Sequence, residues 1–261
     1  MRVCGIRTRL VVPGDDLISL ALEGALAAGE PLCDRDIVVF SAKVIGVSQG
    51  RLVDLSSITP SGKALDLSRK YHLEPAFAEL VVREADSILG GVDLAVLTLK
   101  KGVLIANAGI DQSNAPPGHA ALWPEDPQGS AEELRARFRE KGLDVGVLVV
   151  DSRTLPLRMG SSGVALGIAG FSPMEDLRGK SDLYGRSMKI KRAAVADGIA
   201  SAANLVMGET SESKPIALVR GAPVRFGEGH KIEEALIPMD QCLIMHLLCR
   251  ETKVEPRKDG C

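Results

Sequence analysis

Apolar residues are gathered in runs along the chain, most of them about as long as a β-strand. Each run is bounded by glycine, proline or aspartate. These runs lie at residues 36–46, 93–111, 145–151, 160–170 and 215–221. Within the second run, Lys100-Lys101-Gly102 interrupts the apolar pattern and predicts the turn of a β-hairpin. The fourth run is rich in glycine, which predicts a strand that another backbone or a ligand approaches closely.

Helical patterns occupy two further stretches. Residues 129–142, "GSAEELRARFREKG", place Ser130 and Glu133 at the spacing of a capping box and Gly142 at the end. A second stretch over about residues 188–207 ends at "MGE". Because strands and helices alternate irregularly, the pattern predicts an α+β fold with mixed sheets and flanking helices rather than a doubly wound sheet.

Composition narrows the possible partners. The chain has 261 residues, 45% hydrophobic and 25% charged, which is the balance of an ordinary globular protein. With 32 basic and 34 acidic residues and 3% aromatics, the sequence predicts no surface for nucleic acid or anionic membranes. No apolar run reaches the length of a membrane span, and the N-terminal stretch does not read as a signal peptide. We therefore expect a cytoplasmic protein with small-molecule partners.

Five cysteines are dispersed along the chain without a CxxC pair, which is typical of reduced thiols. Cys242, His246 and Cys249 could share one face of a helix in "DQCLIMHLLCR", as metal ligands do. The alternative is an apolar packing helix, which is favoured because a fourth ligand is not evident.

Two aspartates follow apolar runs that are far apart in the sequence. Asp111 lies in "NAGIDQSN", and the run at 145–150 stops at Asp151. Carboxylates at two strand ends would offer Mg²⁺ or Mn²⁺ the oxygen ligands that hard cations prefer. The alternative for each aspartate is a structural cap of the next turn. The loop-like segment 115–130 lies between the two and is expected to cover the site.

Motifs for several other chemistries are missing from the sequence. It contains no Walker loop, no GxGxxG fingerprint after a strand, no HExxH and no GxSxG. Its histidines, at positions 72, 119, 230 and 246, lie in unrelated contexts. Catalysis by a nucleophile and a histidine therefore has little support.

An ordered set of motifs gives the sequence a resemblance to a known family. "NAGIDQSN", "GSAEELRARF", "VGVLVVDS", "DLYGR", "VADGIASAANLVMGE" and "PIALVRG" follow one another as in the coenzyme F-420-0:L-glutamate ligases, the CofE family, and the resemblance extends from "PGDDL" to about "VRG". The resemblance implies a CofE-like fold and an intertwined homodimer. It also implies a ligase domain over residues 10–235, possibly of two interlocked subdomains, followed by an apolar helix and tail over 236–261.

The family resemblance implies an activity and roles for individual residues. Its members join L-glutamate to a deazaflavin precursor through a γ-glutamyl bond, using GTP and a divalent metal, by way of an acyl phosphate. Positions for two Mg²⁺ or Mn²⁺ sites fall on Asp111, Asp151, Ser152 and Glu209. Nucleotide-binding positions fall on Lys43, Asn114, Met207, Gly208, Glu209, Thr210, Ser211, Glu212, Ser213 and Lys214. No separate catalytic side chain is implied, because this chemistry depends on positioning and charge.

Several positions depart from the family pattern. Val47 replaces a lysine expected to meet the nucleotide, and the segment 8–11, "TRLV", lacks a usual proline. "DSRTLPLRMG" keeps Asp151, Arg158 and Gly160 but loses a Gly-Arg pair and an aromatic residue. The acceptor could therefore be F-420-0 or a folate, pterin or other carboxylate. A second alternative is a non-catalytic paralogue that binds nucleotide or deazaflavin.

Overall fold

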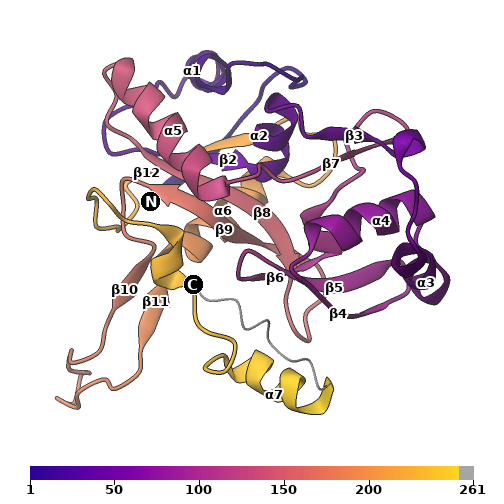
Figure 1. Cartoon of the computed structure of the whole chain (residues 1–261). Coiled ribbons are helices and arrows are strands. Elements are labelled where there is room, and N and C mark those ends of the chain that lie inside the picture. Colours follow the sequence, from indigo (N-terminus) through magenta and orange to yellow (C-terminus); the bar gives the residue numbers. More distant parts are fainter. Residues whose placement is uncertain (253–261) are drawn as a thin grey trace.

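The computed structural model describes residues 1–252 of the chain, and the side chains of residues 1–247. At its centre is a five-stranded sheet (Figure 1), in the order β1 (Arg2–Ile6), β12 (Ile216–Arg220), β2 (Ile37–Ser41), β8 (Gly146–Thr154) and β9 (Ser161–Ala169). β2 and β8 run parallel, and the other neighbouring strands run antiparallel. The prediction of a mixed sheet in an α+β fold is confirmed.

Alternate residues of the central strands face two separate cores, because successive side chains of a strand point to opposite sides. In β2, Val38 and Phe40 belong to one core, and Ile37 and Val39 belong to the other. The first core is covered by the helices α1 (Leu17–Ala27), α2 (Ala42–Ser48) and α5 (Pro127–Glu140). The second core is covered by α6 (Val195–Met207). The sheet is therefore buried on both faces.

The glycine-rich strand β9 is packed between two helices. A Cβ atom at Gly163 would lie 2.2 Å from the carbonyl oxygen of Ala200 in α6. A Cβ atom at Gly167 would lie 2.2 Å from the carbonyl oxygen of Pro127 in α5. Both distances are far below van der Waals contact, so only glycine fits. The close approach predicted for this run is confirmed, and the approaching group is a helix backbone on each face.

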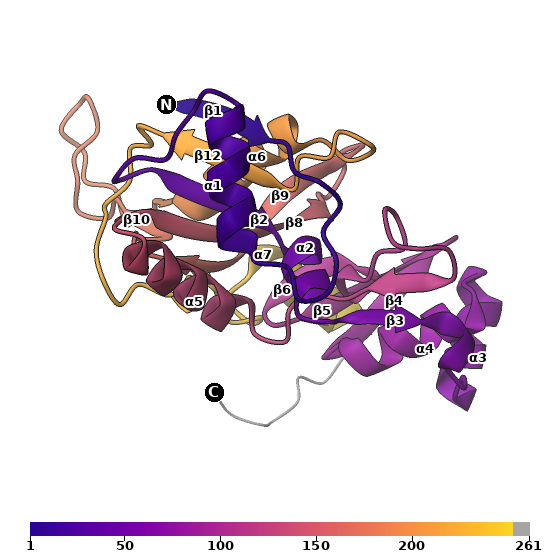
Figure 2. The same ribbon diagram turned by 90° about the horizontal axis from the view of Figure 1, so that it is seen from above.

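A smaller lobe lies to one side of the central sheet (Figures 1 and 2). Its elements are β3 (Leu52–Asp54), η1 (Leu55–Ser57), α3 (Gly62–Tyr71), α4 (Pro75–Glu84), β4 (Ser87–Val92), β5 (Ala95–Lys100), β6 (Val103–Ala106), η2 (Asn107–Gly109) and β7 (His119–Ala121). The lobe has its own apolar core, and β4, β5 and β6 form an antiparallel sheet. The predicted hairpin turn at Lys101-Gly102 is confirmed.

A two-stranded ribbon projects from the body of the molecule (Figures 1 and 2), formed by β10 (Met174–Asp176) and β11 (Arg192–Ala194). The segment between these strands exposes Leu183, Tyr184 and Ile190 almost completely. An isolated two-stranded ribbon is marginally stable in water. This arm therefore lacks the support that the strands of the three-stranded and five-stranded sheets receive from their neighbours.

The described chain ends in a short turn, η3 (Ile232–Ala235), and a helix, α7 (Leu243–Thr252). Cys242 directly precedes α7, and His246 within it is exposed. The side chain of Cys249 and residues 253–261 lie outside the described part of the chain. Among the described helices, none combines the length and the apolar character needed to cross a bilayer.

Two predicted element boundaries were wrong. The strand predicted over 36–46 ends at Ser41, and α2 begins at the next residue. The apolar pattern continues from the strand into the helix, so periodicity does not mark the change. The helix predicted from about residue 188 begins at Val195, after β11. Its predicted end is confirmed, because α6 stops at Met207.

The predicted capping box of α5 was also wrong. The helix begins at Pro127, and the Asp126 carboxylate caps it by accepting a hydrogen bond from the Gly129 amide. Ser130 lies within the first turns, where its hydroxyl donates to the Asp126 carbonyl oxygen. Proline at the first helical position and an aspartate cap were an earlier and stronger start signal.

Candidate active site

One cleft of about 200 Å³ brings together segments that are distant in the sequence. It is lined by the segments that follow β1 and β2, by the middle of β8, by the loop 111–114, and by the connection from α6 to β12. Every residue predicted to bind metal or nucleotide lines this cleft, and so do residues 8–11 and Val47. Their roles in binding remain predictions, but their convergence is an observation.

Asp151 lies within β8 and not at its end, because the strand continues to Thr154. The predicted strand end was therefore wrong. Asp151 follows the alternation of β8 onto the face where Val149 and Trp123 pack. Its Oδ2 accepts a hydrogen bond of 2.6 Å from the indole Nε1 of Trp123, and its Oδ1 accepts one of 2.8 Å from the Ser152 amide.

Burial raises the pKa of Asp151 to about 6, and the hydrogen bonds from Trp123 and Ser152 offset only part of this effect. The negative charge of Asp111 raises the pKa further, whereas Lys43 lowers it. A carboxylate that is costly to ionise in a cleft is a candidate functional group. Above pH 6 its charge is present but poorly compensated.

Asp111 does not end a strand either. β6 stops at Ala106, and the turn η2 lies between that strand and the aspartate. The backbone of Asp111 is instead held by a two-way bridge to Ala121, with N···O distances of 3.1 and 2.8 Å. Both aspartates nevertheless reach one cleft, as the sequence predicted, although neither arrives from the end of a strand.

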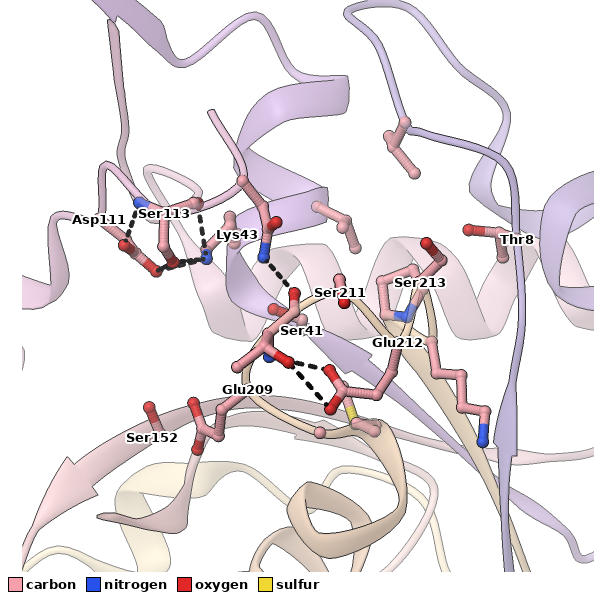
Figure 3. A pocket seen from close by; sticks show the side chains of 18 of the residues that line it. Thr8, Ser41, Lys43, Asp111, Ser113, Ser152, Glu209, Ser211, Glu212 and Ser213 are labelled. Atoms are coloured by element: carbon pink, nitrogen blue, oxygen red, sulfur yellow. Dashed lines mark hydrogen bonds and ion pairs between the residues drawn. The ribbon is translucent and has the colours of Figure 1, made fainter. Parts of the chain in front are cut away.

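The Asp111 carboxylate forms an ion pair with Lys43 Nζ (Figure 3). It also accepts hydrogen bonds from the amide and the hydroxyl of Ser113, at 2.6 and 2.8 Å. Lys43 donates in turn to the carbonyl and hydroxyl oxygens of Ser113. Burial tends to raise the pKa of Asp111, but Lys43 and Ser113 outweigh it and hold this pKa below its ordinary value.

The segment 208–214 forms a polar loop between α6 and β12. It begins at Gly208, whose φ of 78° lies in the left-handed region. The Glu212 carboxylate accepts hydrogen bonds from the amide and hydroxyl of Thr210, which closes the loop on itself (Figure 3). Across the cleft, Asn114 Nδ2 donates to the Thr210 carbonyl oxygen at 2.7 Å. The loop therefore has a defined shape and is linked to the segment that carries Asp111.

Glu209 is exposed at the opposite wall of the cleft, beside Ser152 (Figure 3). Its Oε1 accepts hydrogen bonds from Ser161 Oγ at 2.9 Å and from Asn204 Nδ2 at 2.8 Å. These contacts tie the loop to the start of β9 and to the last turn of α6. Asn204 and Ser161 were not predicted, because single polar residues of this kind leave no pattern in the sequence.

Asp111 and Asp151 both supply carboxylate oxygens to the cleft, and this is the kind of ligand that a hard cation prefers. Within residues 1–252, no group of three or more histidine, cysteine, aspartate or glutamate side chains is arranged to hold a metal ion. A cation here would take its other ligands from hydroxyls, water or phosphate, as Mg²⁺ commonly does. The predicted second site, at Ser152 and Glu209, stays a prediction.

Trp123 is the main residue that sequence reasoning missed. The segment 115–130 was expected to be a loop over the site, but residues 120–124 are buried within the protein. The indole of Trp123 contacts Asp151 from within the protein. The available signal was that the chain has a single tryptophan, placed between the two aspartates.

The fold and the cleft define an α+β enzyme in which carboxylates, a lysine and a polar loop converge, an arrangement suited to phosphate-containing substrates. A profile of the family described as F420-0:gamma-glutamyl ligase matches residues 5–221. The chain therefore belongs to the F420-0:gamma-glutamyl ligase family, and it is an amide-bond-forming ligase.

Three relatives illustrate this likeness, each named coenzyme F420:L-glutamate ligase. The protein of Methanopyrus kandleri is 43% identical over 215 residues, which cover 82% of this chain and 83% of the relative. That of Methanothermobacter thermautotrophicus is 40% identical over 216 residues, covering 82% and 86%. That of Archaeoglobus fulgidus is 36% identical over 242 residues, covering 92% and 94%.

Proposed function

We propose that this protein joins L-glutamate to a carboxylate of the coenzyme F-420 precursor in a γ-glutamyl ligation, using GTP and Mg²⁺ or Mn²⁺. The observation that carries the proposal is the convergence of Asp111, Asp151, Lys43 and the loop 208–214 in one cleft. Family membership supports the reaction class. The choice of GTP over ATP depends on the family alone, because the cleft contains no residue that we can assign to reading guanine.

The proposed reaction has two steps. A carboxylate oxygen of the acceptor attacks the γ-phosphorus of GTP, the bond from that phosphorus to the bridging oxygen breaks, and GDP leaves. The amine of L-glutamate then attacks the acyl carbon, the carbon–oxygen bond to phosphate breaks, and the amine loses a proton. A bound divalent cation would neutralise phosphate charge during the first step.

The chain's own residues would act mainly by positioning and charge. Lys43 lies where an ammonium group can serve both Asp111 and a phosphate, and Ser211 and Ser213 present hydroxyls from the loop (Figure 3). Val47 gives the wall of the cleft an apolar surface. The hairpin tip between β8 and β9 is fully exposed at Leu157 and Met159, which leaves room for an acceptor to approach.

We also propose that the protein acts as a homodimer. The arm between β10 and β11 supports this, because Leu183, Tyr184 and Ile190 are exposed on a ribbon that needs a partner surface. Sedimentation should give twice the chain mass. Replacing Leu183 and Ile190 with serine should then shift the protein towards the monomer, whereas an unchanged mass would remove the arm from the interface.

A ligation assay tests the reaction directly. The purified protein is incubated with L-glutamate, Mn²⁺, GTP or ATP, and either the F-420 precursor or a folate, and products are followed by mass spectrometry. We expect GDP, phosphate and a deazaflavin that has gained one glutamate residue. A glutamylated folate would keep the chemistry and change the acceptor. Deazaflavin binding without turnover would replace the ligase with a binding protein.

Thermal melting gives an independent test of nucleotide binding. A ligand at about a hundred times its dissociation constant adds ~2.7 kcal/mol to the native state, which shifts the melting temperature by several degrees. GTP and Mn²⁺ together should raise the melting temperature by more than the sum of their separate effects, because the carboxylates and phosphates repel each other without the cation. Additive shifts would contradict a shared site.

A further inference from the structure

Trp123 is buried beneath the candidate site, with 1% of its surface exposed. Its indole N–H points at Asp151 Oδ2, at a distance of 2.6 Å. Within the described residues, the other oxygen, Oδ1, accepts only from the Ser152 amide. The indole thus holds one oxygen of the carboxylate in place, and the other oxygen keeps a lone pair that can accept a further contact.

The indole is itself held on several sides. A Cβ atom at Gly109 would lie 2.2 Å from the ring, so this glycine packs directly against the edge of the indole. Lys100 Nζ lies over the ring face, 4.9 Å from its centroid, and is kept there by a hydrogen bond of 2.8 Å to Glu84. Arg51 donates to the Trp123 carbonyl oxygen and to the same glutamate. The ring therefore has little freedom to move.

The same segment also positions the second aspartate. Ala121, two residues before Trp123, forms the two-way backbone bridge to Asp111. Gly109, which packs against the indole, lies two residues before Asp111. The buried segment that contains Ala121 and Trp123 therefore contacts both aspartates. Its backbone bonds to Asp111, and its indole N–H bonds to Asp151.

We propose that Trp123 is a positioning residue of this ligase: its indole N–H sets the orientation of the Asp151 carboxylate, and its segment sets the distance between Asp151 and Asp111, so that the pair can hold a divalent cation. This inference rests on the proposed function. Groups that hydrogen-bond to a ligating carboxylate from behind change metal affinity by about 10–100-fold when they are lost.

The test uses the fact that the chain has one tryptophan. The protein is produced in a host that requires tryptophan and is supplied with the benzothiophene analogue of that amino acid. In this analogue, sulfur replaces the indole N–H and the shape of the ring is kept, so position 123 loses its hydrogen-bond donor. Mn²⁺ binding is then measured by electron paramagnetic resonance against the unmodified protein. We expect the dissociation constant for Mn²⁺ to rise about tenfold or more.

A steady-state measurement separates positioning from a merely structural role. In the analogue protein, the Mn²⁺ concentration for half-maximal ligation should rise, and kcat at saturating Mn²⁺ should recover. Loss of folded protein would instead lower kcat at every Mn²⁺ concentration. Equal Mn²⁺ affinity in both proteins would overturn the role of Trp123 and leave the ligase intact. A failure of the unmodified protein to bind Mn²⁺ would overturn the metal requirement of the proposed function and this inference with it.

The unmodified protein supplies a second readout that does not depend on the analogue folding. A Mn²⁺ ion on Asp151 would be one hydrogen-bonded carboxylate away from the indole, so it should quench most of the Trp123 fluorescence. Asp93 is exposed and pairs with His72, so Asp93→Asn serves as the control. In this variant Mn²⁺ should quench the Trp123 fluorescence as strongly as in the unmodified protein. Asp151→Asn should abolish the quenching. Mn²⁺ that binds without quenching would contradict the proposed arrangement.

Discussion

Asp111 and Asp151 line the same cleft but are held in opposite ways. Asp151 lies within a strand and receives hydrogen bonds from two neutral donors, the Trp123 indole and the Ser152 amide. Asp111 lies on a loop and is paired with the flexible, positively charged side chain of Lys43. The pKa of Asp151 is raised to about 6 by burial, whereas Lys43 and Ser113 hold that of Asp111 below its ordinary value.

The difference shows how one residue type can have two roles. A neutral donor orients a carboxylate without cancelling its charge, so the charge of Asp151 remains poorly compensated above pH 6. Lys43 both orients and neutralises Asp111. Asp151 would therefore contribute more than Asp111 to the binding free energy of a divalent cation. At Asp111 the cation would have to share the carboxylate with Lys43.

The largest effect is expected on activity. Asp111→Asn and Asp151→Asn should each lower metal-dependent ligation by at least about hundredfold, because loss of a ligand should exceed the 10–100-fold effect of an outer-shell partner. Asp93→Asn, outside the cleft, is the matched control and should keep full activity. Normal turnover in either cleft variant would remove that aspartate from the metal site.

In the absence of metal, substitutions of the two aspartates should change the free energy of unfolding in opposite directions. At pH 7.5, Asp151→Asn should raise the free energy of unfolding by about 1 kcal/mol, since the gain from removing a poorly compensated charge should exceed the cost of losing one of the two hydrogen bonds, which the asparagine NH2 group cannot accept. Asp111→Asn should lower it by about 0.5 kcal/mol, because a partly exposed ion pair is lost. Urea unfolding measures both, and shifts of the same sign would contradict the comparison.

The smallest effect is a pH dependence. The folded pKa of Asp151, about 6, exceeds its ordinary value of 3.8, so the stability that this group contributes is present at low pH and lost as pH rises through 6. The stabilising effect of Asp151→Asn should therefore grow as pH rises from about 4 to 6 and level off above about pH 7. The pKa of Asp111 is lowered, so its contribution is present above 3.8 and lost as pH falls. Melting curves for both variants between pH 4.5 and 7.5 should therefore show an effect of Asp151→Asn that changes with pH and an effect of Asp111→Asn that stays constant, and the latter should shrink only as pH falls below about 3.8.

The sequence was sufficient for the mixed sheet, the hairpin, the end of α6 and the gathering of the predicted site residues. Apolar runs and glycine positions reflect backbone packing, and such packing leaves a pattern in the sequence. The glycines of β9 show this well, because Gly163 and Gly167 are required by two approaching helices. The ordered motifs then located the cleft residues without any knowledge of the fold.

Other features depend on contacts between distant segments and leave no pattern. The bond from Trp123 to Asp151 joins the segment after β7 to the central sheet, and nothing near either residue signals it. The bond from Asn114 to Thr210 spans almost a hundred positions. Both aspartates were expected at strand ends because that is the usual arrangement. The bridge of Asp111 to Ala121 and the length of β8 are tertiary outcomes.

The pairing of β1 with β12 has a consequence for folding on the ribosome. Arg2 lies opposite Arg220, so the first strand to be synthesised has no partner until the last strand of the sheet has emerged. The smaller lobe, whose contacts are more local, can form earlier. The edge of the central sheet therefore closes last, and the rate of folding should depend on this long-range pairing more than on helix formation.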